Sequence, residues 1–131
     1  MNILIVDDNP INRKMLLEYL ARYGHCDIAS NGVDAVDQFE AEFTTGNPYD
    51  LVLLDLMMPR MNGQNALRKI RAIERQYSVP PRDQAVVIIV TAVGSPEDVL
   101  KTTEFDRNTD LIKKPVKQSE LVAKMKAHGL L

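Results

Sequence analysis

The chain has 131 residues, of which 45% are hydrophobic and 26% are charged, with a formal net charge of −2. This length suits one domain that buries its own core, so we predict a single domain over residues 1–131. The only cysteine, Cys26, excludes an internal disulfide and favours a reducing, cytoplasmic location. No apolar run approaches the ~18 residues of a membrane span, and the acidic start of the chain does not resemble a signal peptide.

The charges are distributed unevenly along the chain. Residues 1–55 hold 3 basic and 10 acidic side chains, whereas residues 56–131 hold 13 basic and 8 acidic ones. This polarity favours local acidic and basic sites. Because no overall basic excess exists and the tyrosines follow no pattern, nucleic-acid binding is not expected.

Apolar runs alternate with helical patterns along the whole chain. The runs that predict strands lie, in order, at 3–6, 26–30, 51–54, 85–90 and 111–112. Each is followed by an amphipathic stretch that predicts a helix, and these stretches lie at 11–24, 31–43, 63–77, 95–105 and 119–129. Pro10 and Gly24 bracket the first helix, and Ser95 followed by Pro96 is a start signal for the fourth.

This alternation predicts a doubly wound α/β domain with a five-stranded parallel sheet. The strands at 3–6, 51–54 and 85–90 are apolar at every position and therefore need helices on both faces of the sheet. Right-handed crossovers then place all the carboxyl ends of the strands along one edge, where such folds bind their ligands.

Polar side chains follow the strands at that edge. They are Asp7 and Asp8 after the first strand, Asp55 after the third, Thr91 after the fourth, and Lys113 or Lys114 after the fifth. Three carboxylates held together repel one another, so they bind protons or recruit a cation. An all-oxygen site that is open to water and phosphate suits Mg²⁺. One carboxylate then remains available as a nucleophile that forms an acyl phosphate, with a lysine to stabilise the transferred group.

Four segments carry a resemblance to a known family. They are "ILIVDDN" (3–9), "DLVLLDLMMPRMNG" (50–63), "VTA" (90–92) and "KKP" (113–115). In order and separation they resemble the response-regulator receiver domains of two-component signalling, over nearly the whole chain. The resemblance implies the flavodoxin-like (βα)5 fold and a phospho-accepting switch that catalyses its own phosphorylation and dephosphorylation without being a turnover enzyme.

The resemblance also implies a role for each site residue. Asp55 is the expected phosphoacceptor, the carboxylates of Asp7, Asp8 and Asp55 with the backbone carbonyl of Met57 are the expected Mg²⁺ ligands, Thr91 is the switch hydroxyl, and Lys114 pairs with the phosphoryl group. The peptide bond between Lys114 and Pro115 is expected to be cis. Met58, Pro59 and Gly63 are expected to shape the loop beyond Asp55.

Other interpretations of these residues exist. The Asp7–Asp8 pair taken alone is typical of a turn or helix cap, and Thr91 could simply satisfy a strand end. A pseudo-receiver that acts only as an interaction module would not accept phosphate. A phosphohydrolase using an aspartyl phosphate would place a general acid two residues after Asp55, where this chain has Met57.

The remaining expectations concern partners. Long loops before 51–54 and at 75–84 are similar to extensions in receivers attached to hybrid histidine kinases, and a free single-domain regulator is the alternative. A histidine kinase or histidine phosphotransfer protein is the expected donor. The downstream target is a protein or an attached domain, reached through a surface formed by 95–105, 111–112 and 119–129. Leu111 occupies the position of the usual aromatic switch residue. The basic side chains of the third helix are expected to form a solvated face: Arg68, Lys69, Arg71 and Arg75.

Overall fold

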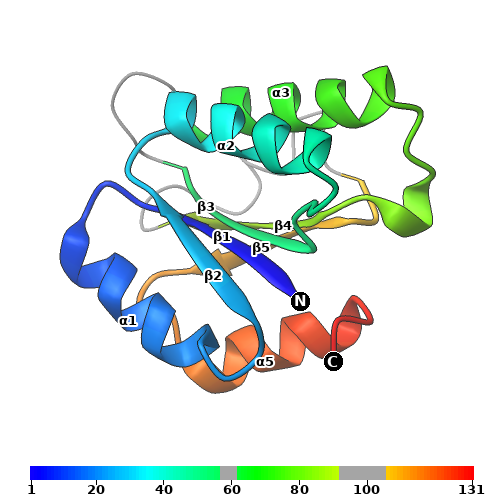
Figure 1. Ribbon diagram of the computed structural model, residues 1–131. Coiled ribbons are helices and arrows are strands. Elements are labelled where there is room, and N and C mark those ends of the chain that lie inside the picture. Colours follow the sequence, from blue (N-terminus) through cyan, green and yellow to red (C-terminus); the bar gives the residue numbers. More distant parts are fainter. Residues whose placement is uncertain (57–61, 92–105) are drawn as a thin grey trace.

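The computed structural model describes residues 1–56, 62–91 and 106–131. Strands and helices alternate through these segments (Figure 1). The elements are β1 (Asn2–Val6), α1 (Pro10–Leu20), β2 (His25–Ala29), α2 (Gly32–Thr44), β3 (Leu51–Asp55), α3 (Gly63–Gln76), the 3₁₀ helix η1 (Pro81–Asp83), β4 (Val86–Thr91), β5 (Thr109–Lys113) and α5 (Gln118–Ala127). The helix predicted at 95–105 lies outside the described residues, as do Met57, Met58 and Pro59.

The five strands form one parallel sheet in the order β2-β1-β3-β4-β5, which confirms the predicted fold class. Every residue of β3 and β4 is buried, as expected for central strands that are covered on both faces. The order of the strands reverses between β1 and β3. In open α/β sheets this switch point is where ligands bind, beyond the carboxyl ends of the strands.

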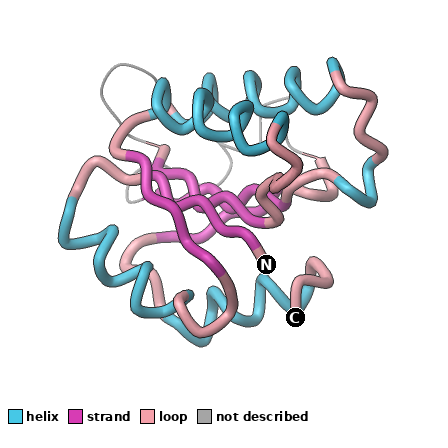
Figure 2. The backbone as a smooth tube through the Cα atoms, in the orientation of Figure 1, coloured by secondary structure: helices cyan, strands magenta, loops and turns pink. Residues whose placement is uncertain are grey.

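The helices form a layer on each face of the sheet (Figures 1 and 2). Helices α1 and α5 cover one face, where Leu16, Leu20, Leu121 and Met125 pack on one set of strand side chains. Helices α2 and α3 cover the other face, where the buried residues include Phe39, Leu67 and Ile70. The alternation of side chains along each strand supplies both layers, since Leu51 and Leu53 enter the first core and Val52 and Leu54 the second.

Asparagine side chains cap the N-termini of three helices. Asn9 accepts hydrogen bonds from the backbone at the start of α1, Asn31 does so for α2, and Asn62 for α3. Pro10 occupies the first turn of α1, as predicted. Helix α1 ends at Leu20, before the predicted boundary at residue 24.

Two other boundaries differ from those predicted. Strand β5 covers Thr109–Lys113, longer than the predicted 111–112, because edge strands tolerate polar residues such as Asp110 within the ladder. The long loop at 75–84 contains the last residues of α3 and the short η1 helix. Among the described residues, no helix has the length and apolar character needed to cross a bilayer.

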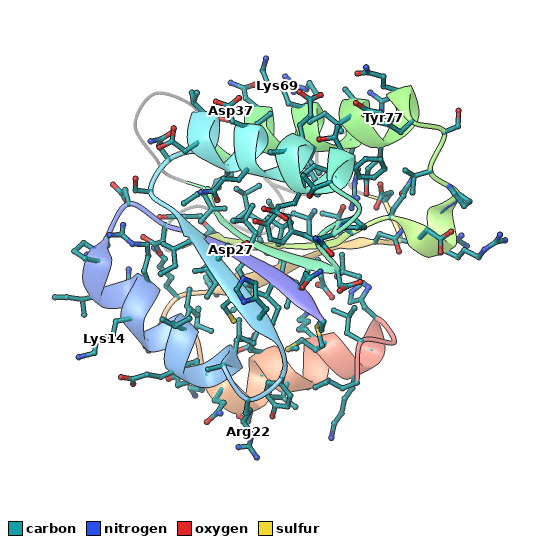
Figure 3. All side chains as sticks on the ribbon, in the orientation of Figure 1. Lys14, Arg22, Asp27, Asp37, Lys69 and Tyr77 are labelled. Carbon is teal, nitrogen blue, oxygen red and sulfur yellow. The ribbon has the colours of Figure 1, made fainter. Side chains whose placement is uncertain are left out.

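Arg71 does not belong to a solvated face, and that prediction was wrong for this residue. Its side chain is only 5% exposed and its Nη1 donates to Oε1 of Glu74 at 2.8 Å. It also donates to the carbonyl oxygens of Ala85 at 2.8 Å and Asn108 at 3.0 Å. Arg68, Lys69 and Arg75 are exposed as expected, and Figure 3 shows Lys69 on the outer side of α3.

The physical reason is the position of Arg71 on the helix. Residues 67, 70, 71 and 74 follow the spacing of one buried helical stripe, so Arg71 and Glu74 enter the interior together. A base and an acid three residues apart on a helix can form an ion pair, and here their shared face is the buried one.

Candidate functional site

The acidic loop after β1 is fixed by local hydrogen bonds. The N–H of Asp7 donates to the carbonyl of Ala29 at 3.2 Å, which extends the pairing of β1 with β2. The N–H of Asn9 donates to Oδ1 of Asp7 at 2.9 Å, and the Asn9 side chain caps α1. Asp7 is 1% exposed while Asp8 is exposed to solvent, so one carboxylate is held inside and the next lies at the surface.

Asp55, the last residue of β3, lies beside the acidic loop that follows β1. Val6 pairs with Leu54 in the parallel ladder, so the residues that follow them, Asp7 and Asp55, are neighbours at the carboxyl edge. Asp55 is 4% exposed. The apolar run at 51–54 is therefore a buried central strand, and its last residue, Asp55, places a carboxylate at the switch point.

Gly63 allows α3 to begin directly behind Asp55. Its N–H donates to the carbonyl of Leu56 at 3.0 Å, and a Cβ at this position would lie 2.7 Å from the carbonyl oxygen of Asp55. Any larger residue would therefore displace the backbone of the loop or of the helix. The expectation that Gly63 shapes this loop has a direct geometric basis.

The three predicted carboxylates converge. Asp7, Asp8 and Asp55 each place a carboxylate oxygen within 4.8 Å of the others, and they are the only such group of acidic, histidine or cysteine side chains in the described residues. The Nζ of Lys114 lies 3.4 Å from Oδ2 of Asp55 and 3.8 Å from Oδ2 of Asp7. One cation thus faces two nearly buried carboxylates, and its side chain is 25% exposed.

Thr91 and Lys114 approach the cluster from β4 and from the end of β5. Thr91 is the last residue of β4 and is 2% exposed. The N–H of Lys114 donates to the carbonyl of Thr91 at 2.8 Å, which fixes the two residues relative to each other. The Lys114–Pro115 peptide bond is cis, as expected. Between the two lysines that the sequence left open, Lys114 is the one that contacts the carboxylates, and Lys113 is exposed.

The residues present fit a hard divalent cation. The cluster offers carboxylate oxygens alone, which is the donor set that Mg²⁺ prefers. Asp8 is exposed, so the cluster remains open to water and to a phosphate group on that side. The backbone carbonyl of Met57, the fourth expected ligand, lies outside the described residues.

An apolar pocket lies beside the carboxylates. It has a volume of about 350 Å³ and is lined by Asp7, Asn12, Met15, Leu16, Val90, Lys114, Pro115 and Val116. Its walls come from α1, from β4 and from the segment that joins β5 to α5. Ile11, at the start of α1, is 77% exposed. The acidic site therefore opens next to apolar surface.

A second charged cluster lies on β5, away from this site. Oδ1 of Asp110 accepts from Nζ of Lys124 at 2.8 Å, and Oδ2 lies 2.9 Å from Nε2 of His128. Burial alone would raise the pKa of Asp110, but these two partners and the N–H of Leu111 outweigh it and lower the pKa. Leu111 itself is partly buried and packs against the core under α2 and α3.

The sequence reasoning did not identify Arg13 and Asn9 as parts of the site. Nη1 of Arg13 donates to the backbone carbonyl of Asp7 at 2.8 Å, and Asn9 braces the carboxylate of the same residue. An asparagine in the cap position and an arginine four residues later, directly after an acidic pair, were the available signal.

The fold and the acidic cluster define a class of signalling domain, and comparison with known proteins shows the same class. The family model of the response regulator receiver domain matches residues 3–126. The chain therefore belongs to the response regulator receiver family, whose members act in two-component signalling.

The chain is similar to a hybrid histidine kinase and to the solved receiver domain of a sensor histidine kinase. It is 37% identical over 130 residues to hybrid signal transduction histidine kinase L of Dictyostelium discoideum, a match that covers 97% of this chain and 7% of that kinase. It is similar to the solved receiver domain of sensor histidine kinase PA1611 from Pseudomonas aeruginosa, which has a magnesium ion in its active-site cleft, with a TM-score of 0.74, 30% identity, and 98% and 97% of the two chains covered.

A third relative was solved with its partner. The structure of the Saccharomyces cerevisiae histidine phosphotransfer protein Ypd1 with the receiver domain of Ssk1 matches with a TM-score of 0.77 and 28% identity, covering 98% of this chain and 88% of that one. In that structure the receiver domain of Ssk1 is bound to the histidine phosphotransfer protein Ypd1.

Proposed function

We propose that this chain accepts a phosphoryl group on Asp55 from a partner phosphohistidine, in a reaction that depends on Mg²⁺. The observation that carries the proposal is the convergence of Asp7, Asp8 and Asp55 within 4.8 Å, faced by Lys114. Structural similarity to a receiver with magnesium in its cleft supports the same assignment.

Each residue has a distinct part in the proposed reaction. A carboxylate oxygen of Asp55 forms a bond to phosphorus while the phosphorus–nitrogen bond of the donor breaks, and the electron pair leaves with the imidazole. Lys114 lies close enough to stabilise the oxygens of the transferring group. The hydroxyl of Thr91 donates a hydrogen bond to the new phosphoryl group. Asp7, Asp8 and Asp55 would hold Mg²⁺, which when bound would neutralise charge on the phosphoryl oxygens.

The donor is a histidine kinase or a histidine phosphotransfer protein. A donor protein must reach a carboxylate that is only 4% exposed, so it must cover the surroundings of the site during transfer. Exposed Ile11 and the adjoining apolar pocket supply surface that such a partner would bury. The modified domain then shifts a conformational equilibrium and binds or releases a downstream protein or an attached domain.

Intact-mass spectrometry after incubation with acetyl phosphate tests the chemistry. The wild type and Asp37→Asn, a control on the outer side of α2 (Figure 3), should gain one phosphate group of about 80 Da in the presence of Mg²⁺, as expected for an acyl phosphate. Asp55→Asn should gain nothing, and chelation of Mg²⁺ should abolish the gain in every sample. Equal labelling of Asp55→Asn and wild type would refute the assignment of the phosphoacceptor.

A protein donor tests the docking surface separately from the chemistry. Ile11→Ser should slow transfer from a phosphorylated phosphotransfer protein several-fold and leave labelling by acetyl phosphate unchanged, because only the protein donor contacts α1. If neither donor labels the wild type, the chain is a pseudo-receiver that acts as an interaction module. If Asp55 instead supports repeated hydrolysis of phosphate esters, the phosphohydrolase alternative replaces the proposal.

A further inference from the structure

The backbone of Asp7 is held by a long side chain from the next element. Nη1 of Arg13, the fourth residue of α1, donates to the carbonyl oxygen of Asp7 at 2.8 Å, and Arg13 is partly buried. The N–H of Asp7 donates to Ala29, and its Oδ1 accepts from the N–H of Asn9. Three hydrogen bonds therefore fix the backbone and one carboxylate oxygen of this residue.

The oxygen left over is the one that faces the site. Oδ2 of Asp7 lies 3.8 Å from Nζ of Lys114, and Asp7 contributes a carboxylate oxygen to the cluster with Asp8 and Asp55. The contact from Arg13 ends on the main chain of Asp7, so it constrains where the acidic loop lies without occupying a carboxylate oxygen. Loss of an outer group that orients a metal ligand typically lowers metal affinity by about 10- to 100-fold.

We propose that Arg13 is a positioning residue that holds the Asp7–Asp8 loop in the geometry that binds a divalent cation. This inference rests on the proposed function, since it assumes that the acidic cluster is the Mg²⁺ site. Loss of the Arg13 hydrogen bond frees the carbonyl of Asp7 and lets the loop spread under the repulsion of its own carboxylates.

The direction in which Mg²⁺ affinity changes on replacement of Arg13 distinguishes a positioning role from a purely electrostatic one. Removing a positive charge near three carboxylates would by itself tighten cation binding, because the local potential becomes more negative. Removing a positioning hydrogen bond weakens it. Lys14 is the matched control: it follows Arg13 directly on α1, carries the same charge, is exposed, and points away from the sheet in Figure 3.

The experiment is a Mg²⁺ titration of the purified chain followed by the backbone amide shifts of residues 7–9 in two-dimensional NMR. Arg13→Met should weaken Mg²⁺ binding by about tenfold, in line with other groups that support metal ligands. Lys14→Met should bind Mg²⁺ as tightly as the wild type or slightly tighter. Thermal unfolding without Mg²⁺ shows that each variant is folded, and if Arg13→Met is not, Arg13→Gln is titrated instead, with weaker binding again expected.

A second readout distinguishes positioning from a general loss of structure. In acetyl phosphate labelling, Arg13→Met should need more Mg²⁺ for half-maximal rate and should approach the wild-type rate at saturating Mg²⁺. Binding by Arg13→Met that equals or exceeds that of Lys14→Met would overturn the inference while leaving the proposed function intact. Absence of any Mg²⁺ response in the wild type would instead remove the proposed function on which the inference rests.

Discussion

Replacement of Arg71 by methionine should destabilise the protein more than any surface change on α3. The guanidinium joins the end of α3 to the starts of β4 and β5 through Glu74, Ala85, Asn108 and Thr109. Its Nε also lies 3.3 Å from Oδ2 of Asp106, close enough for an ion pair. Arg71→Met removes all of these contacts at once and leaves the Glu74 carboxylate, whose side chain is 2% exposed, without its cation.

The magnitude follows from the uncompensated charge. Breaking a buried pair by removing one partner costs about 3–5 kcal/mol of unfolding free energy. With about 2.1 cal/mol/K of unfolding entropy per residue over 131 residues, each kcal/mol lowers Tm by about 3.6 °C, so Tm should fall by about 11–18 °C. Thermal and urea unfolding, followed by circular dichroism, measure both quantities. The matched control is Arg75→Met, an exposed position of the same helix, which should change stability by less than about 0.5 kcal/mol.

A double variant tests whether the pair acts as a unit. Arg71→Met with Glu74→Leu removes both charges, so it should regain at least about 1 kcal/mol relative to the sum of the single variants. Recovery stays incomplete because the N–H of Ala85, which donates to Oε2 of Glu74 at 2.8 Å, loses its acceptor. An Arg71→Met variant as stable as Arg75→Met would refute the reasoning.

Two further predictions concern the loop behind the site and the cluster on β5. Gly63→Ala should lower the unfolding free energy by about 1–3 kcal/mol, because the new Cβ meets the backbone of Asp55; urea unfolding measures this, and an unchanged midpoint would show that the loop adapts freely. Asp110→Asn should cost about 1 kcal/mol near neutral pH, where the carboxylate is paired with Lys124 and His128. Because the folded pKa of Asp110 is lowered from 3.8, this contribution is present above that pH and is lost as pH falls through the folded pKa. Wild type and Asp110→Asn should therefore converge in acid, and a difference that grows on acidification would contradict the assignment.

Much of the fold was predictable because its signals are local. The fully apolar runs at 3–6, 51–54 and 85–90 are β1, β3 and β4, and their need for cover on both faces determined a parallel sheet between helices. The convergence of Asp7 and Asp55 followed as well, since parallel strands bring their carboxyl ends to one edge.

Structural features that depend on partners far away along the chain were harder to predict from the sequence. Whether Arg71 is solvated or buried depends on carbonyl groups at Ala85 and Asn108, 14 and 37 residues away along the chain. Asp110, the polar residue within β5, is paired with Lys124 and His128, which lie 14 and 18 residues further along the chain. The hydrogen bond from Arg13 to the main chain of Asp7 requires the exact course of a loop, which residue types alone do not determine.

The side chain of Asp110 accepts a backbone N–H of strand β5, and this contact affects how β5 can associate with other molecules. β5 is an edge of the sheet, and an edge with free N–H groups can recruit a strand from another molecule. Here Oδ1 of Asp110 accepts the N–H of Leu111 at 2.7 Å, while Lys124 and His128 cover the carboxylate. To pair with the N–H of Leu111, a strand from another molecule would have to displace the carboxylate of Asp110. This contact satisfies an N–H of the β5 edge and thereby lowers the tendency of that edge to pair with a strand of another molecule.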